Sequence, residues 1–187
     1  MSRPRRALST GEHGLSDRRV VLRTLSEADL PLIEPWYARA AEAIAGLGAG
    51  RSEADPRQHL EEARSQPGRE LLAIVLADDG ELVGLLDRRA PCPEAGWLTV
   101  SFLAMAEHHR GRGLGSEAVL ALEEEARRRG LAHRFAAGVT ADAGRALYFW
   151  LRLGYRPLLQ ADLPWPSPRN GVVWMVRETE QEGLRGG

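Results

Sequence analysis

Lysine is absent from this chain of 187 residues, so all 25 of its basic side chains are arginine. Several classes of protein depend on a lysine that this sequence cannot supply. A Walker A loop places lysine on nucleotide phosphates, a protein kinase uses a strand lysine, and pyridoxal phosphate enzymes bind their cofactor as a lysine Schiff base. The sequence excludes all three.

Cysteine is nearly absent too, because Cys92 is the single thiol. An internal disulfide and a four-cysteine zinc site are therefore impossible. A chain of this length can bury roughly 70% of its unfolded surface, so it needs neither a disulfide nor a structural metal in order to fold. The five histidines show no H-E-x-x-H or similar spacing. We predict no metal, and we interpret His108 and His109 as exposed loop residues.

Excess charge and long apolar runs are also lacking. A net charge of −1 and a pI near 6.5 give no global field that would attract nucleic acid or an anionic membrane. No stretch reaches the 18 apolar residues of a membrane span, and residues 1–18 lack the apolar core of a secretory signal. We expect a cytoplasmic protein with one domain, residues 19–178, between disordered tails, residues 1–18 and 179–187.

Hydrophobic periodicity and turn residues predict a mixed α/β domain without internal repeats. A strand at 20–25 precedes a helix that starts after Ser26, and the glycines at 46, 48 and 50 end that helix. The later helices are predicted at 55–65, 114–129 and 142–153, and the later strands at 71–77, 81–87, 97–105, 134–139, 155–159 and 172–176. The order is β-α-α-β-β-β-α-β-α-β-β.

The segment HHRGRGLGSEAV, His108–Val119, lies between an apolar strand and a long helix. Glycines let a backbone approach a ligand closely, and a helix start offers unpaired N–H groups that bind anions. This turn therefore suits a pyrophosphate, although a plain tight turn is the simpler alternative. A dinucleotide fingerprint fits poorly, because Ser116 stands where its last glycine or alanine belongs. The candidate residues are Arg110, Gly111, Arg112, Gly113, Leu114, Gly115 and Ser116.

Two motifs at this spacing resemble signatures of the GCN5-related N-acetyltransferase (GNAT) family. The first is the R-x-x-G-x-G of Arg110–Gly115 with the helix SEAVLALEEEARRRG, which resembles the family's acetyl-CoA signature. The second is RALYFWLRLGYRPL, Arg145–Leu158, and VVLRTLSEADLPLI resembles the family's first strand and helix. The resemblance covers roughly Val20–Glu178, with every element in family order.

The resemblance implies an α/β (α+β mixed) fold with a central, mostly antiparallel, twisted sheet. We expect six to seven strands and about four helices, with the sheet splayed between the fourth and fifth strands. It implies acetyl-CoA as co-substrate, with its pantetheine arm in the splay near Leu103 and Met105 and its pyrophosphate on Arg110–Ser116. Trp150 is expected to pack against the cofactor.

The catalytic residues are where the sequence departs from the family. Trp150 fills the slot where many members carry a tyrosine that protonates the departing thiolate. Tyr148 is the nearest phenol and the candidate acid, although a helix places it about 200° from Trp150. Departure of the thiolate without a side-chain acid is an alternative. Glu94 is the candidate base, with Asp87 as a second carboxylate. A water relay along Thr99 and Ser101 is a further alternative.

The resemblance implies an acyltransferase: an N-acetyltransferase in which a primary amine attacks acetyl-CoA directly in a ternary complex. The alternative is a non-catalytic acyl-CoA-binding domain of the same fold. We predict that Trp165 and Arg169, in the loop DLPWPSPRNG, contact a small-molecule or peptide amine. A homodimer is left open, whereas nucleic acid and membrane partners are not expected.

Overall fold

The computed structural model describes residues 18–44, 55–158 and 171–179. The predicted tails lie outside these residues, except that Arg18 pairs with Glu124 and the Thr179 amide donates to the His133 carbonyl over 3.0 Å. The loop that carries Trp165 and Arg169 also lies outside the described residues. In the described part, no helix is both long and apolar enough to cross a membrane.

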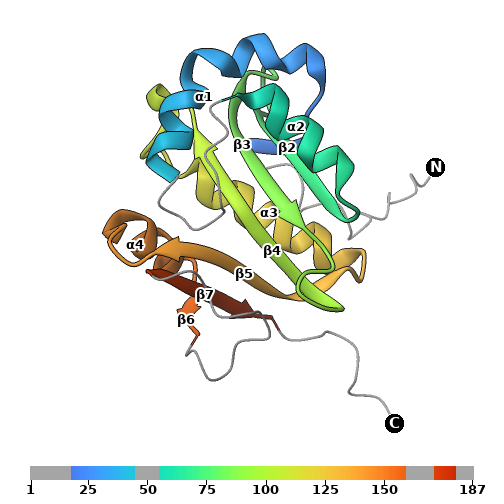
Figure 1. Cartoon of the computed structure of the whole chain (residues 1–187), viewed down its shortest axis with the longest axis vertical. Coiled ribbons are helices and arrows are strands. Elements are labelled where there is room, and N and C mark those ends of the chain that lie inside the picture. Colours follow the sequence, from blue (N-terminus) through green and yellow to red (C-terminus); the bar gives the residue numbers. More distant parts are fainter. Residues whose placement is uncertain (1–17, 45–54, 159–170, 180–187) are drawn as a thin grey trace, which may run out of the picture.

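Among the described residues, one mixed sheet of seven strands organises the domain (Figure 1). Its spatial order is β1 (Val20–Thr24), β2 (Arg69–Leu76), β3 (Leu82–Arg89), β4 (Gly96–Met105), β5 (Ala132–Thr140), β7 (Val172–Glu178) and β6 (Arg156–Pro157). Every neighbouring pair is antiparallel except β4 and β5, which are parallel. The predicted α/β class, strand number and mostly antiparallel sheet are confirmed.

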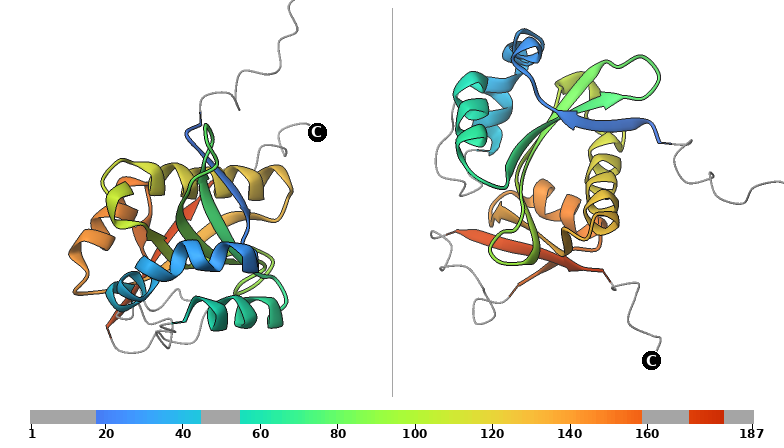
Figure 2. Two further views of the ribbon diagram at one scale, coloured as in Figure 1. Left: turned by 90° about the horizontal axis from the view of Figure 1, so that it is seen from above. Right: turned by 90° about the vertical axis from the view of Figure 1, so that its right-hand side faces the viewer.

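In the part of the chain that the structure describes, α-helices cover both faces of the sheet (Figure 2). On one face lie α1 (Leu30–Ile44), which continues a short 3₁₀ turn (Glu27–Asp29), and α2 (Pro56–Ser65). On the other face lie α3 (Leu114–Arg128) and α4 (Gly144–Arg152). Each face therefore has its own apolar core.

Consecutive strand residues point to opposite faces of a sheet, and β3 shows this directly. Leu85 packs into the core beneath α1 and α2, whereas Leu86 packs into the core beneath α3 and α4. Both side chains are fully buried. The near-continuous apolar runs of β2 and β3 in the sequence have this cause, since both sides of these strands are covered.

The sheet opens between β4 and β5, as the resemblance implied. Parallel pairing joins only the first half of β4, Gly96–Val100, to β5, and the strands then diverge (Figure 1). A bulge in β4 coincides with this point: Val100 pairs with Arg88 and Phe102 with Asp87, so Ser101 has no partner on β3. A bulge bends its strand and changes which side chains face each side. The carboxyl half of β4 consequently turns away from β5.

Candidate functional site

A pocket occupies the opening between β4 and β5 and reaches both faces of the sheet. Ala40 of α1 borders it on one face, and Phe149 and Trp150 of α4 border it on the other. The remaining lining residues are Val100, Ser101, Phe102, Leu103, Ala104, Met105, Arg110, Gly115, Ala137, Gly138, Ala143 and Ala146. Most of them are apolar and several are small, so the pocket suits a slender acyl chain.

The edge of β4 inside this pocket is unpaired toward β5. Residues 102–105 pair with β3, and no β5 residue pairs with residues 101–105. Main-chain groups on such an edge can bind an extended ligand as a strand would. Leu103 and Met105 lie on this edge, as predicted for contacts to the pantetheine arm. The Met105 carbonyl accepts a hydrogen bond from Arg110 Nε over 3.0 Å.

The predicted pyrophosphate turn lies at one end of the pocket and leads into α3. Gly113 is the N-cap of α3 with φ of 82°, and Gly111 has φ of 74°, conformations that favour glycine. Among the described residues, nothing accepts a hydrogen bond from the main-chain N–H groups of residues 111–115. These donors and the positive end of the α3 dipole form an anion site.

Arg19 and Glu117 hold this turn in place. Arg19 pairs with Glu117 in the first turn of α3 and donates to the Arg112 carbonyl over 3.0 Å. The pairing neutralises Glu117, a carboxylate that would otherwise oppose an anion at the helix start. Ser116 is half-buried beside it, and Leu114 is buried in the core and anchors the helix. Arg110 is the one charged side chain among the described lining residues.

The second signature motif builds the opposite wall of the pocket. Trp150 is buried and meets the Tyr155 ring edge to face at 4.7 Å. The Tyr155 hydroxyl donates to Glu123 over 2.7 Å, and Arg177 donates to the other carboxylate oxygen over 2.9 Å. Burial raises the pKa of Glu123 and also that of Tyr155. Glu123 is thus a buried anchor for Tyr155 and Arg177.

The predicted catalytic residues, Tyr148 and Glu94, are not among the residues that line the pocket. Tyr148 is 62% exposed and lies under the Arg152 guanidinium, 5.9 Å from its ring centroid. Its position follows from helix geometry, since Trp150 takes the buried face of α4. Glu94 is exposed in the turn before β4, whereas the pocket begins at Val100. The structure does not bring either residue to the pocket.

The alternatives to Glu94 have different surroundings. Thr99 is buried and its hydroxyl donates to the Cys92 carbonyl over 2.9 Å, while Ser101 lines the pocket at the bulge. Asp87 is fully buried and contacts His59 and Arg69. Sequence reasoning did not single out His59. The available signal was its place in the buried stripe of α2, which contains Pro56, His59, Leu60 and Ala63.

His109 differs from the exposed loop residue that the sequence predicted, because only 5% of its surface is accessible. Donor atoms of Glu81, His108 and His109 lie within 4.8 Å of one another. Arg112 donates to His109 Nδ1 over 3.2 Å, which leaves the ring proton on Nε2, 3.1 Å from Glu81. Hydrogen bonds thus use both ring nitrogens of His109, which connects the β2–β3 turn to the anion site, whereas His108 Nε2 lies 3.7 Å from Glu81 Oε1.

Comparison with known proteins relates this architecture to acetyltransferases. The sequence profile of the Acetyltransferase (GNAT) family matches residues 31–155. An acetyltransferase from Thermus thermophilus is 28% identical, with a TM-score of 0.64 over 86% of this chain and 97% of that one. A GCN5-related N-acetyltransferase from Kribbella flavida is 24% identical, with a TM-score of 0.63 over 86% and 98%.

A more distant structure shares the fold. The spermidine N-acetyltransferase from Vibrio cholerae, solved with CoA and spermine, is 14% identical, with a TM-score of 0.64 over 86% of this chain and 95% of that one. A search of curated proteins finds no significant match.

Proposed function

Because the chain belongs to the GNAT acetyltransferase family, we propose that it transfers acetyl from acetyl-CoA to a primary amine by direct attack in a ternary complex. One observation carries the proposal: the free edge of β4 leads, through a short 3₁₀ turn at Glu107–His109, to N–H groups at 111–115 that have no acceptor among the described residues. An extended pantetheine arm fits the first feature and a pyrophosphate fits the second. The two features therefore match successive parts of one cofactor.

In this proposal the acetyl-CoA thioester lies in the pocket between β4 and β5. The pyrophosphate is held by the N–H groups of residues 111–115 and by Arg110, and Trp150 packs on the cofactor from α4. The chain's main contribution is the positioning of two reactants, which removes much of the entropic cost of a bimolecular reaction. Main-chain N–H groups near Met105 stabilise the oxyanion that develops on the carbonyl.

A non-catalytic acyl-CoA-binding domain is the second candidate function. Two observations favour it: tryptophan stands in the slot of the usual acid, and the described lining residues include no carboxylate and no imidazole. Catalysis without a side-chain acid is chemically reasonable, because a thiol with a pKa near 8.5 leaves as the thiolate without much help. The two candidates differ in turnover and not in binding.

The test is thiol release from acetyl-CoA in the presence of peptide N-termini, polyamines, aminoglycosides and amino acids. We expect at least one class of amine to release CoA at a rate that saturates with amine concentration, and calorimetry to show CoA binding. Binding without release for every amine would favour the non-catalytic domain. Absence of binding would overturn both candidates.

A further inference from the structure

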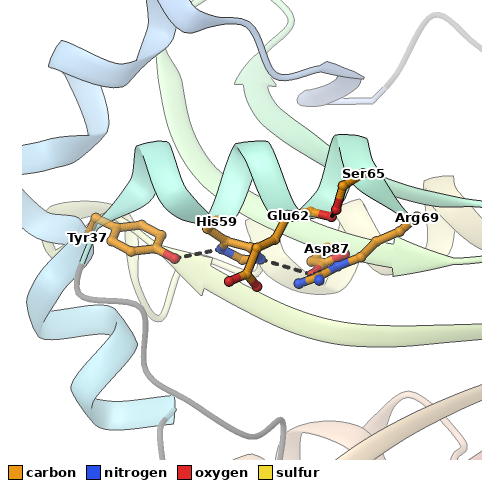
Figure 3. Close-up of polar contacts among 6 residues, drawn as sticks. All are labelled: Tyr37, His59, Glu62, Ser65, Arg69 and Asp87. Carbon is orange, nitrogen blue, oxygen red and sulfur yellow. Dashed lines mark hydrogen bonds and ion pairs between the residues drawn. The ribbon is translucent and has the colours of Figure 1, made fainter. Parts of the chain in front are cut away.

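A line of buried polar side chains lies on the α1–α2 face of the sheet (Figure 3). The Tyr37 hydroxyl of α1 is 2.6 Å from His59 Nδ1 of α2. His59 Nε2 is 2.9 Å from Asp87 Oδ2 of β3. Arg69 of β2 donates to the same Oδ2 from Nε over 2.9 Å and from Nη2 over 2.6 Å. Four elements thus contribute one residue each to a continuous chain of hydrogen bonds.

The partners fix the direction of these hydrogen bonds. A carboxylate that already accepts from Arg69 can only accept from His59 as well, so Nε2 carries the ring proton. Nδ1 of the neutral imidazole is then an acceptor, and the Tyr37 hydroxyl donates to it. In enzymes with a hydroxyl, imidazole and carboxylate in this order, the proton moves from the hydroxyl to the imidazole, and the carboxylate orients the ring and stabilises its charge.

One atom of this chain lacks the partner that a purely structural anchor would give it. Asp87 Oδ1 is buried and has no hydrogen-bond partner among the described residues. A buried acceptor left unpaired is costly, so native proteins seldom retain one without a reason. All of the hydrogen bonds that this carboxylate makes end on Oδ2, although the ion pair with Arg69 balances its charge.

The same chain lies directly behind one wall of the pocket. The Phe102 ring lines the pocket, stacks on Tyr37 at 5.7 Å and meets His59 edge to face at 5.3 Å. Ala40, less than one turn after Tyr37 on α1, also lines the pocket. Since the described lining residues contain no carboxylate or imidazole of their own, a base for the reaction must act from behind this wall or from solvent.

We propose that Tyr37, His59 and Asp87 form a proton relay that takes up the proton lost by the acceptor amine, a role that rests on the proposed function. The amine nitrogen attacks the thioester carbonyl carbon, the new C–N bond forms, and the C–S bond breaks to release the thiolate. The relay requires a water that enters past the Phe102 ring, because Tyr37 is buried and does not itself line the pocket. Through this water the proton from nitrogen passes to the Tyr37 oxygen while the hydroxyl proton moves to His59 Nδ1. Return of that proton through water to the thiolate completes the cycle.

Two further charged groups lie around His59. Arg69 forms an ion pair with Asp87, the carboxylate that accepts from the ring. Glu62, one turn later on α2, also faces the ring and is half-buried (Figure 3). Because the relay residues act through water, they are positioning residues, and a pH profile is the measurement that separates this role from a structural one.

The experiment measures kcat and kcat/KM for the amine between pH 6 and pH 9. Tyr37→Phe removes the hydroxyl and keeps the ring on Phe102, and His59→Gln removes the titrating group. We expect kcat at neutral pH to fall at least tenfold in both, and the rising limb of the profile to move to higher pH. Acetyl-CoA affinity, measured by calorimetry, should stay within twofold, which also shows that each variant is folded.

Asp29→Asn is the matched control, because it removes another buried carboxylate–arginine pair on the α1 side of the sheet. Asp29 accepts from Arg23 over 2.6 Å and lies before α1, away from the pocket. We expect it to lower stability and leave the pH profile unchanged. The same profile change in Asp29→Asn, or no change in Tyr37→Phe, would overturn the relay and leave the proposed function standing. A wild-type protein without transfer to any amine would overturn the proposed function and the relay together.

Discussion

The two faces of the sheet hold two halves of a site that differ in how they are built. On the α3–α4 face the anion site consists of main-chain N–H groups supplied by five consecutive residues. On the α1–α2 face the polar chain consists of side chains from four elements, separated by 22 and 28 residues along the sequence. The first half leaves a local motif in the sequence, whereas the second half leaves none.

The difference has a physical basis. A ligand bound by main-chain groups needs glycine at positions of positive φ, and such positions must adjoin one another. Side chains that form a buried network need only matching donors and acceptors, which any fold can bring together from distant positions. A sequence therefore reveals an anion turn more readily than a buried relay.

The largest effect tests whether the two faces fold as one unit. Leu85→Ala and Leu86→Ala delete equal side chains from adjacent residues on opposite faces. Each should lower the free energy of unfolding by about 2–5 kcal/mol, because a fully buried leucine leaves a cavity. Urea unfolding followed by fluorescence and by circular dichroism should show one coincident transition in both variants. Separate transitions would mean that the faces unfold independently.

The next effect concerns acid stability on the α1–α2 face. The hydrogen bonds from Arg23, followed by those from Ser26, lower the pKa of Asp29 to about 2 from a usual value near 3.8. A lowered pKa in the folded state means that this stabilisation is present above about pH 4 and is lost as the pH falls toward 2. At pH 6 the free energy of unfolding of the wild type should exceed that of Asp29→Asn by about 1–2 kcal/mol.

The difference in the free energy of unfolding between these two proteins should shrink as the pH falls from 4 to 2, because Asp29, with a pKa of about 2, is half protonated at pH 2. Denaturant unfolding at pH 6, 4, 3 and 2 measures it directly. A difference that stays constant across this range would show that the Arg23–Asp29 ion pair does not supply the stabilisation.

The third effect tests the anion site itself. Gly113→Glu places a carboxylate beside the proposed pyrophosphate, and a Cβ at Gly113 comes within 3.3 Å of the Arg19 guanidinium. CoA affinity measured by calorimetry should fall at least tenfold, about 1.4 kcal/mol. Gly130→Glu is the matched control, since Gly130 follows the same helix with φ of 66° and open space around it. Equal CoA affinity in the two folded variants would contradict the placement.

The sequence predicted the order of elements, because each element depends on local patterns, and the resemblance to the GNAT family implied the splay. The cofactor contacts of Arg110–Ser116 stay a prediction. Glycine spacing placed the turn at Gly113, and apolar periodicity placed the helices. The sequence did not predict a role for His59. It lies in an apolar stripe of α2, and only the structure shows that Tyr37 and Asp87 contact it. The bulge at Ser101 was also missed, because no glycine marks it in the sequence. It changes which β4 residues share a face.

The smallest effect separates two aromatic residues of α4 that lie two positions apart. Trp150 lines the pocket, whereas Tyr148 is 62% exposed on the helix surface. Trp150→Phe keeps an aromatic ring but shortens the wall, so we expect KM for acetyl-CoA to rise about threefold, less than 1 kcal/mol, with little change in kcat. Tyr148→Phe should leave both constants within twofold, because its hydroxyl is not at the pocket. A general acid at Tyr148 would instead lower kcat by about a hundredfold or more. Such a loss would show that α4 turns its other face toward the thiolate during the reaction, and it would move the source of the proton from water to this phenol.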